Sequence, residues 1–89
     1  MAGLRRIVLD VLKPVEPSIM DIARKLSEMD SVDGVEIVVR EVDRRVETVR
    51  VTVDGENLNF DKINTALEKF GASVHSVDKV AAGKRLITP

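Results

Sequence analysis

Two valine-rich runs in the middle of the chain, joined by a short link, constrain the fold more than any other feature. In VEIVVREV (35–42) and ETVRVTVD (47–54) apolar and polar residues alternate, which is typical of strands with one buried face. The link DRR (43–45) is short enough for a hairpin, because antiparallel neighbours can be joined by a few residues. The centre of the chain therefore predicts two adjacent antiparallel strands.

A strand and a helix are predicted before this hairpin. LRRIVLDVLK (4–13) is rich in Val, Ile and Leu and stops at Pro14, which favours a first strand. Ser18 is a suitable N-cap for a helix over 18–30, whose apolar residues recur at helical spacing. Gly34 can take a positive φ and is expected to shape the turn after this helix.

A second helix and a last strand are predicted after the hairpin. Asn59 is a suitable N-cap for a helix over 59–70, and Gly71 is expected to end it. Residues 72–82 then form the last strand, and 83–89 is a C-terminal extension.

The order β-α-β-β-α-β over residues 1–89 predicts one α+β domain. It is the order of the ferredoxin-like fold (the α/β plait): a four-stranded antiparallel sheet with strand order 4-1-3-2 and two helices on one face. The predicted core consists of Ile7, Leu9, Val11, Ile22, Leu26, Val35, Ile37, Val39, Val49, Val51, Val53, Ile63, Leu67 and Phe70.

Composition excludes several classes of function. Fourteen Lys and Arg against fifteen Asp and Glu give a formal charge of −1, which lacks the basic excess that nucleic acid binding needs. No apolar run reaches the roughly 20 residues that span a membrane, and the absence of Cys removes thiolate chemistry. We expect a cytoplasmic protein that binds no nucleic acid, no membrane and no cofactor.

Three basic pairs, Arg5–Arg6, Arg44–Arg45 and Lys84–Arg85, do not change that expectation. The predicted topology places the first and third pairs at one end of the sheet and the middle pair at the other. The chain has no Tyr or Trp, and its two Phe lie on the core stripe of the second helix, so no platform for base stacking exists.

The stretch HSVD (75–78) contains the residue types of a hydrolytic triad. Successive side chains of a strand point to opposite faces, so His75 diverges from Ser76 and from Asp78. A nucleophile and its base must lie within about 3 Å of each other. We therefore predict no catalytic residue here and no enzyme.

We expect these residues instead to contribute to the sheet face that the helices leave open, where a ligand or a protein could contact them. Alternation places Asp10 and Arg50 on that face, and one parity of the last strand adds His75 beside Asp10. The opposite parity turns Ser76 and Asp78 outward instead, and both remain open. The same face is expected to carry Val8, Leu12, Val38, Arg40, Val42 and Val77, whose apolar members favour cover by a ligand or a protein.

The stretch DGENLNFD (54–61) weakly resembles a calcium loop. Asp54, Glu56 and Asp61 are the acidic candidates, with Asn57 and Asn59 as further oxygen ligands. The Gly lies at the second position rather than the sixth, and Thr65 occupies the twelfth position, which is usually Glu. A turn followed by a helix N-cap explains the same residues without a metal.

Three segments carry a family likeness. RRIVLDVLKP (5–14), LNFDKI (58–63) and VHSVDKVAAGK (74–84) resemble the archaeal family known as domain of unknown function 211. The chain departs from that family's pattern at Asn59 and Lys79, where the family usually has acidic residues. The resemblance implies a ferredoxin-like domain assembled into a homo-oligomeric ring, with no assigned activity.

These observations favour a self-associating, non-enzymatic binding or scaffold domain. We expect the last strand, and Lys84 to Ile87 after it, to contact the sheet of a neighbouring copy. The alternative is a regulatory module that binds a small molecule or a divalent cation at a subunit interface, similar to ACT domains in topology only.

Overall fold

The strands and helices follow in the predicted order. The structure, a computed structural model, describes residues 3–87. Its elements are β1 (Leu4–Pro14), α1 (Ile19–Ser27), β2 (Val32–Val42), β3 (Val46–Gly55), α2 (Phe60–Lys69) and β4 (Ser73–Ala82). Of the predicted C-terminal extension, residues 88 and 89 lie outside the described residues.

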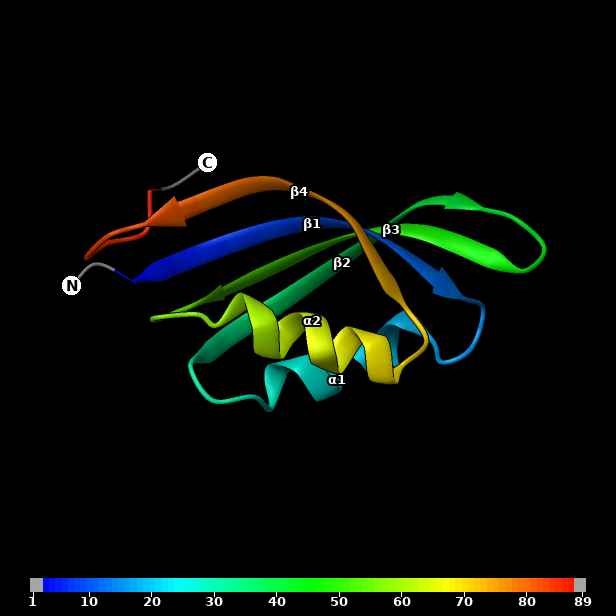
Figure 1. Cartoon of the computed structure of the whole chain (residues 1–89), viewed down its shortest axis with the longest axis horizontal. Helices are drawn as coiled ribbons and strands as arrows, with labels where there is room; N and C mark the ends of the chain where they lie inside the picture. The colour runs from blue at the N-terminus through cyan, green and yellow to red at the C-terminus, as the bar shows by residue number, and fades with distance from the viewer. Residues whose placement is uncertain (1–2, 88–89) are drawn as a thin grey trace.

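The strands form one antiparallel sheet with the order β2-β3-β1-β4. This is the predicted 4-1-3-2 order read from the opposite edge of the sheet. Both helices lie on the same side of the sheet, so the other side is open (Figure 1). The α+β arrangement is therefore confirmed.

The core lies between the helices and the two central strands. Alternate residues of β1 and β3 face the helices, and one apolar stripe of each helix packs against them. The buried cluster comprises Ile7, Leu9, Val11, Ile22, Leu26, Val49, Val51, Val53, Leu58, Ile63, Leu67 and Ala72.

The predicted core residues are buried in the centre of the sheet, but those at its edge are only partly buried or exposed. Val39 is 38% exposed, so its assignment to the core is wrong. Val35, Ile37 and Phe70 are only partly buried against the cluster. Val35, Ile37 and Val39 are less buried than predicted because they lie on β2, an edge strand that has a neighbouring strand on one side only.

The capping predictions for both helices are confirmed. The Ser18 side chain accepts a hydrogen bond from the Asp21 N–H at 3.3 Å, and the Asn59 Oδ1 accepts one from the Lys62 N–H at 3.1 Å. These side chains satisfy backbone donors that a first helical turn leaves free.

Gly71 ends α2 with a φ of +80°, as predicted. Its N–H donates to the Glu68 carbonyl at 2.9 Å, and the Ala72 N–H donates to the Leu67 carbonyl at 3.0 Å. This pair of bonds is a Schellman motif. Since Leu67 and Ala72 both belong to the core, the motif also fixes where β4 begins.

The end of α1 differs from the prediction. The helix stops at Ser27 rather than at 30, and β2 begins at Val32 rather than at 35. The residue with positive φ in this turn is Ser31, at 72°, and not Gly34, which pairs with Asp54 inside the sheet. A tertiary hydrogen bond holds the turn, because the Ser31 carbonyl accepts from the Glu56 N–H at 2.9 Å.

The molecule is elongated, with principal extents of 43 × 23 × 18 Å. The tip of the β2–β3 hairpin projects beyond both helices at one end (Figure 1). At the other end the Gly83 N–H donates to the Gly3 carbonyl at 3.0 Å, which ties the chain after β4 to the chain before β1.

Candidate functional site

The open face of the sheet gathers polar side chains from its central strands. In β1, Arg6, Val8 and Asp10 occupy alternate positions, opposite Asp54, Thr52 and Arg50 of β3 respectively. Paired residues of antiparallel strands project to the same side of a sheet. The face therefore has a central row in which the Arg6–Asp54 ion pair, the β-branched pair Val8 and Thr52, and the oppositely charged residues Asp10 and Arg50 follow one another.

A hollow of about 480 Å³ lies over this row. All four strands contribute to it, through Arg6, Val8, Glu36, Arg50, Thr52, Asp78 and Lys79. Val8 is only 8% exposed although no helix covers this face, because the longer side chains around it shield it. The volume is within the range of small-molecule sites.

Arg6 and Asp54 form a two-pronged ion pair at one end of the hollow. Arg6 Nε lies 2.7 Å from Asp54 Oδ1, and Arg6 Nη2 lies 3.0 Å from Asp54 Oδ2. The hydrogen bond from Arg6 is the main reason that the pKa of the Asp54 carboxyl lies below its ordinary value. Both oxygens of the Asp54 carboxylate are therefore already bonded to Arg6.

The suggested calcium ligands do not converge. Asp54 is bound to Arg6, Glu56 is exposed in the turn, and Asp61 lies in the first turn of α2. Within residues 3–87 no three His, Cys, Asp or Glu side chains are placed to hold a metal ion together. Asn59 serves as the cap of α2, as the alternative explanation requires.

Two of the four candidate residues for a ligand or an interface, Asp10, Arg50, His75 and Asp78, meet in the hollow. Arg50 and Asp78 both line it, whereas Asp10 and His75 do not. Asp10 lies directly opposite Arg50 on one side and opposite Ser76 on the other. Ser76 and Asp78, rather than His75, therefore point to the open face, which is the second of the two arrangements that the sequence left open.

Irregular pairing of β4 explains this parity. The register with β1 shifts between Asp10 and Val11, which leaves His75 without a partner, and shifts again between Val8 and Leu9. The Ser76 hydroxyl donates to Asp78 Oδ1 at 2.6 Å and does not bond to His75. The three residues of the apparent triad are therefore not arranged as a nucleophile, a base and an orienting acid.

A bulge also changes the expected face of β2. Val38 pairs with Arg50 as expected, but the register shifts between Val39 and Glu41, so that Glu41 pairs with Thr48. The strict alternation that put Arg40 and Val42 beside Val38 does not hold beyond the shift. An extra residue in one strand reverses the faces of everything after it.

Both edge strands of the sheet, and the hairpin that ends one of them, carry exposed apolar side chains. Val77 pairs with Leu9 and Val80 with Ile7, so both lie on the helix side of β4, where α2 does not cover them. The exposed fractions are 38% for Val39, 69% for Val42, 39% for Val46, 50% for Val77 and 57% for Val80. We call Val77 and Val80 the β4 patch, and Val39, Val42 and Val46 the hairpin patch.

The basic pairs lie at opposite ends, as predicted. Arg5 Nε donates to the Gly83 carbonyl at 3.1 Å, and Arg5 Nη2 bonds to the Lys84 carbonyl. Arg44 and Arg45 occupy the hairpin tip. No helix among the described residues is both long and apolar enough to cross a membrane.

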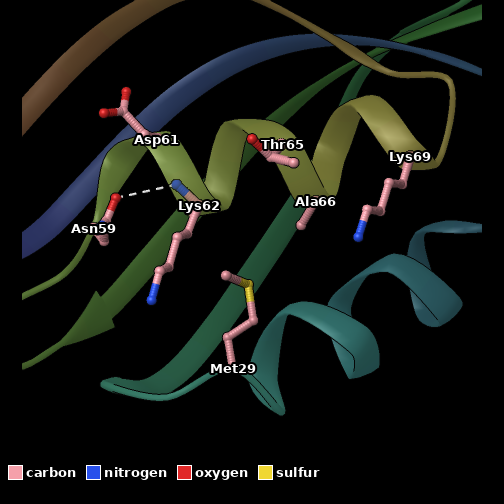
Figure 2. Close-up of a pocket in the computed structure, with 7 residues that line it drawn as sticks. All are labelled: Met29, Asn59, Asp61, Lys62, Thr65, Ala66 and Lys69. Carbon is pink, nitrogen blue, oxygen red and sulfur yellow. Dashed lines mark hydrogen bonds between the residues drawn. The ribbon is translucent and has the colours of Figure 1, made fainter.

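Sequence reasoning missed several residues of the open hollow. Arg6 and Glu36 stand two positions before Val8 and Val38, so the same alternation could have identified them. Lys79 could not be found in this way, because the bulges of β4 interrupt the alternation. A second hollow, between the two helices, was not expected at all and is shown in Figure 2.

Comparison with known proteins gives one family. The family model DUF211, described as "Uncharacterized ArCR", matches residues 5–89. An uncharacterized protein of Methanocaldococcus jannaschii, MJ0319, is 52% identical over 87 residues, which cover 98% of this chain and 90% of that protein. Neither description names an activity, a ligand or a partner.

Proposed function

The chain belongs to the archaeal family of domain of unknown function 211, and we propose that it acts as a self-associating, non-enzymatic cytoplasmic domain of ferredoxin-like topology. In this proposal it assembles through the two edges of its sheet. The observation that carries the proposal is the presence of exposed valines at both edges, in the β4 patch and in the hairpin patch.

The positions of the two patches favour a head-to-tail contact. β2 and β4 are the opposite edges of one sheet, so a contact between the hairpin patch of one copy and the β4 patch of the next joins two different surfaces. Contacts of this kind repeat from copy to copy and close into a ring when the rotation allows. A neighbouring strand along either edge would also pair the backbone N–H and C=O groups that the edge leaves free.

The chain after β4 supports the same contact. Arg5 donates hydrogen bonds to the backbone carbonyls of Gly83 and Lys84, which hold the start of this segment against the end of the sheet. Ile87 is 72% exposed. A neighbouring sheet is the cover that we propose for Lys84 to Ile87.

Light scattering of the purified protein at micromolar concentration tests the proposal. We expect a mass that is a multiple of 9.8 kDa, and a shift toward the monomer in Val80→Glu and in Val42→Glu. Met20→Glu is the matched control, because Met20 is also apolar and 64% exposed but lies on α1.

A wild-type mass near 9.8 kDa that does not change on truncation after Gly83 would show that the edges are simply hydrated. Equal disruption by Met20→Glu would show that added charge, and not the position of the edge residues, dissociates the assembly.

The open hollow supports a second candidate, a regulatory module for a small molecule at the subunit interface. Its walls have cations at Arg50 and Lys79 and acids at Glu36 and Asp78, which suits a ligand with charges of both signs. A thermal-shift screen tests it, since a ligand at about 100 times its Kd stabilises by about 2.7 kcal/mol. Arg50→Gln is expected to abolish any such shift.

A further inference from the structure

A groove runs between the two helices on the side of the molecule away from the open sheet face (Figure 2). Its volume is about 480 Å³, which is within the range of small-molecule sites. The lining residues are Met29, which follows α1, and Asn59, Asp61, Lys62, Thr65, Ala66 and Lys69 of the α2 side.

The groove continues into a second cavity of about 330 Å³, with which it shares Met29, Asn59 and Lys62. Two residues of left-handed backbone line this cavity, Ser31 with a φ of 72° and Asn57 with a φ of 58°. Non-glycine residues adopt this conformation rarely, and they persist where the surrounding structure holds them.

The surrounding structure does hold this wall. The Ser31 carbonyl accepts a hydrogen bond from the Glu56 N–H at 2.9 Å. The same carbonyl packs so closely on Gly55 that an added Cβ there would lie 1.9 Å from it. Both contacts form in the structure without a ligand, as is expected of a pre-organised site.

Two lysines of α2 extend into the groove. Figure 2 shows the side chains of Lys62 and Lys69 on the side of α2 that faces α1, whereas the Asp61 carboxylate points to the other side of the helix. Across residues 3–87 neither lysine has a carboxylate within 4.0 Å. Lys69 suits the C-terminal turn of the helix, but a cation at Lys62 is disfavoured by the helix dipole.

Ala66, Thr65 and Met29 line the space between the two lysines. Ala66 lies between them along the helix, and the Met29 side chain approaches from the α1 side (Figure 2). Lys62 and Lys69 are seven positions apart, so their Cα atoms are separated by about 10 Å along the helix axis. The groove thus presents two cations, separated by a short and mostly apolar floor.

We propose that this groove binds a linear organic dicarboxylate, with one carboxylate at Lys62, the other at Lys69, and the hydrocarbon chain across Ala66 and Met29. Carboxylates fit better than phosphates, because Asp30 in the adjoining cavity opposes a ligand of higher negative charge. The site is separate from the sheet edges proposed for assembly, so either proposal can fail without the other.

Titration of the purified protein with suberate, an extended dicarboxylate, tests the proposal. Isothermal calorimetry measures the affinity, and amide and methyl NMR shifts locate the ligand. We expect a Kd on the order of 1 mM, as two exposed ion pairs and a small apolar contact allow. Shifts are expected at Met29, Lys62, Ala66 and Lys69. Octanoate, with one carboxylate, and succinate, with too short a chain, should bind more weakly.

Matched variants separate the specific site from general charge. Lys62→Gln and Lys69→Gln should each raise the Kd for suberate about fivefold, the upper end of an exposed ion pair. Lys79→Gln removes the same charge from the open sheet face and should leave the Kd unchanged. Ala66→Leu fills the floor without changing any charge and should abolish binding, with thermal melting as the check that it folds.

Three results would overturn the proposal. The first is the absence of shifts at the groove residues at saturating suberate. The second is equal affinity for octanoate, which would show that the second carboxylate contributes nothing to binding. The third is equal weakening by Lys62→Gln and Lys79→Gln, which would assign it to the overall charge of the protein.

Discussion

At the residue scale, Lys13 shows how a neighbouring strand allows a charged residue to be buried. It follows the core residues Ile7, Leu9 and Val11 in the same alternation, and it is only 1% exposed. Its Nζ donates to Glu47 Oε1 at 2.8 Å and to the Val15 carbonyl at 3.1 Å. Glu47 is the residue opposite Lys13 in β3, so the sheet register supplies the counter-charge.

This pair predicts an asymmetric response to mutation. Glu47→Gln leaves the buried ammonium without a counter-charge and should lower the free energy of unfolding by about 2–4 kcal/mol. The double variant Lys13→Met with Glu47→Leu removes both charges and should recover most of that loss, because apolar replacement of a buried pair is often neutral. Urea denaturation of the two variants and the wild type measures the difference.

The pair would be unimportant if Glu47→Gln changed the free energy of unfolding by less than about 0.5 kcal/mol, the usual range of surface substitutions. A double variant less stable than Glu47→Gln would show instead that the ion pair contributes specific packing that Met and Leu cannot replace.

At the scale of elements, the turns between them depend on contacts made elsewhere in the chain. The turn from α1 to β2 bends at Ser31 because its carbonyl packs against the end of β3 at Gly55 and bonds to Glu56. Gly34, although glycine is a common turn residue, lies inside β2. No atom beyond its chain neighbours lies within 4 Å of where a Cβ would be. Two glycines of similar appearance in the sequence therefore have different roles.

Substitution of these two glycines by alanine tests the difference. Gly55→Ala places a Cβ 1.9 Å from the Ser31 carbonyl, so the turn must move, and we expect a loss of about 2 kcal/mol or more. Gly34→Ala meets no atom and restricts the unfolded chain, so it should be neutral or stabilise by about 0.5 kcal/mol. Thermal or urea unfolding of both variants measures the two changes, and equal stabilities would contradict the role assigned to Gly55.

At the scale of the whole molecule, the fold leaves much of its apolar surface unburied. The helices cover the central strands, but they end before the hairpin tip (Figure 1) and leave Val77 and Val80 of β4 exposed. A domain of about this size buries only some 60–65% of the surface of its unfolded chain. Association through the edges is therefore a source of stability as well as a proposed function.

Stability should accordingly depend on protein concentration. If assembly contributes to folding, about a hundredfold increase in concentration should raise the Tm by roughly 5 °C or more. Val80→Glu should melt at the same Tm at both concentrations, because it removes the β4 patch from the contact. Differential scanning calorimetry measures both. A Tm of the wild type that is independent of concentration would show that the folded monomer is stable by itself.

The sequence by itself determined the elements and their order, because these depend on local properties. The alternation in β1 and β3, the caps at Ser18 and Asn59 and the stop at Gly71 are all set by residues within a few positions of one another. With four strands and two helices in this order, chain connectivity left little choice of topology, so the sheet order also followed.

Only the tertiary structure decided which side chains meet. The bulges in β2 and β4 shift the faces of the residues beyond them, and these shifts depend on pairing with β3 and β1. The burial of Lys13, the bend at Ser31 and the groove beside Lys62 each require contacts between distant segments. Local sequence does not encode such contacts, because their free energy arises only after the elements have packed.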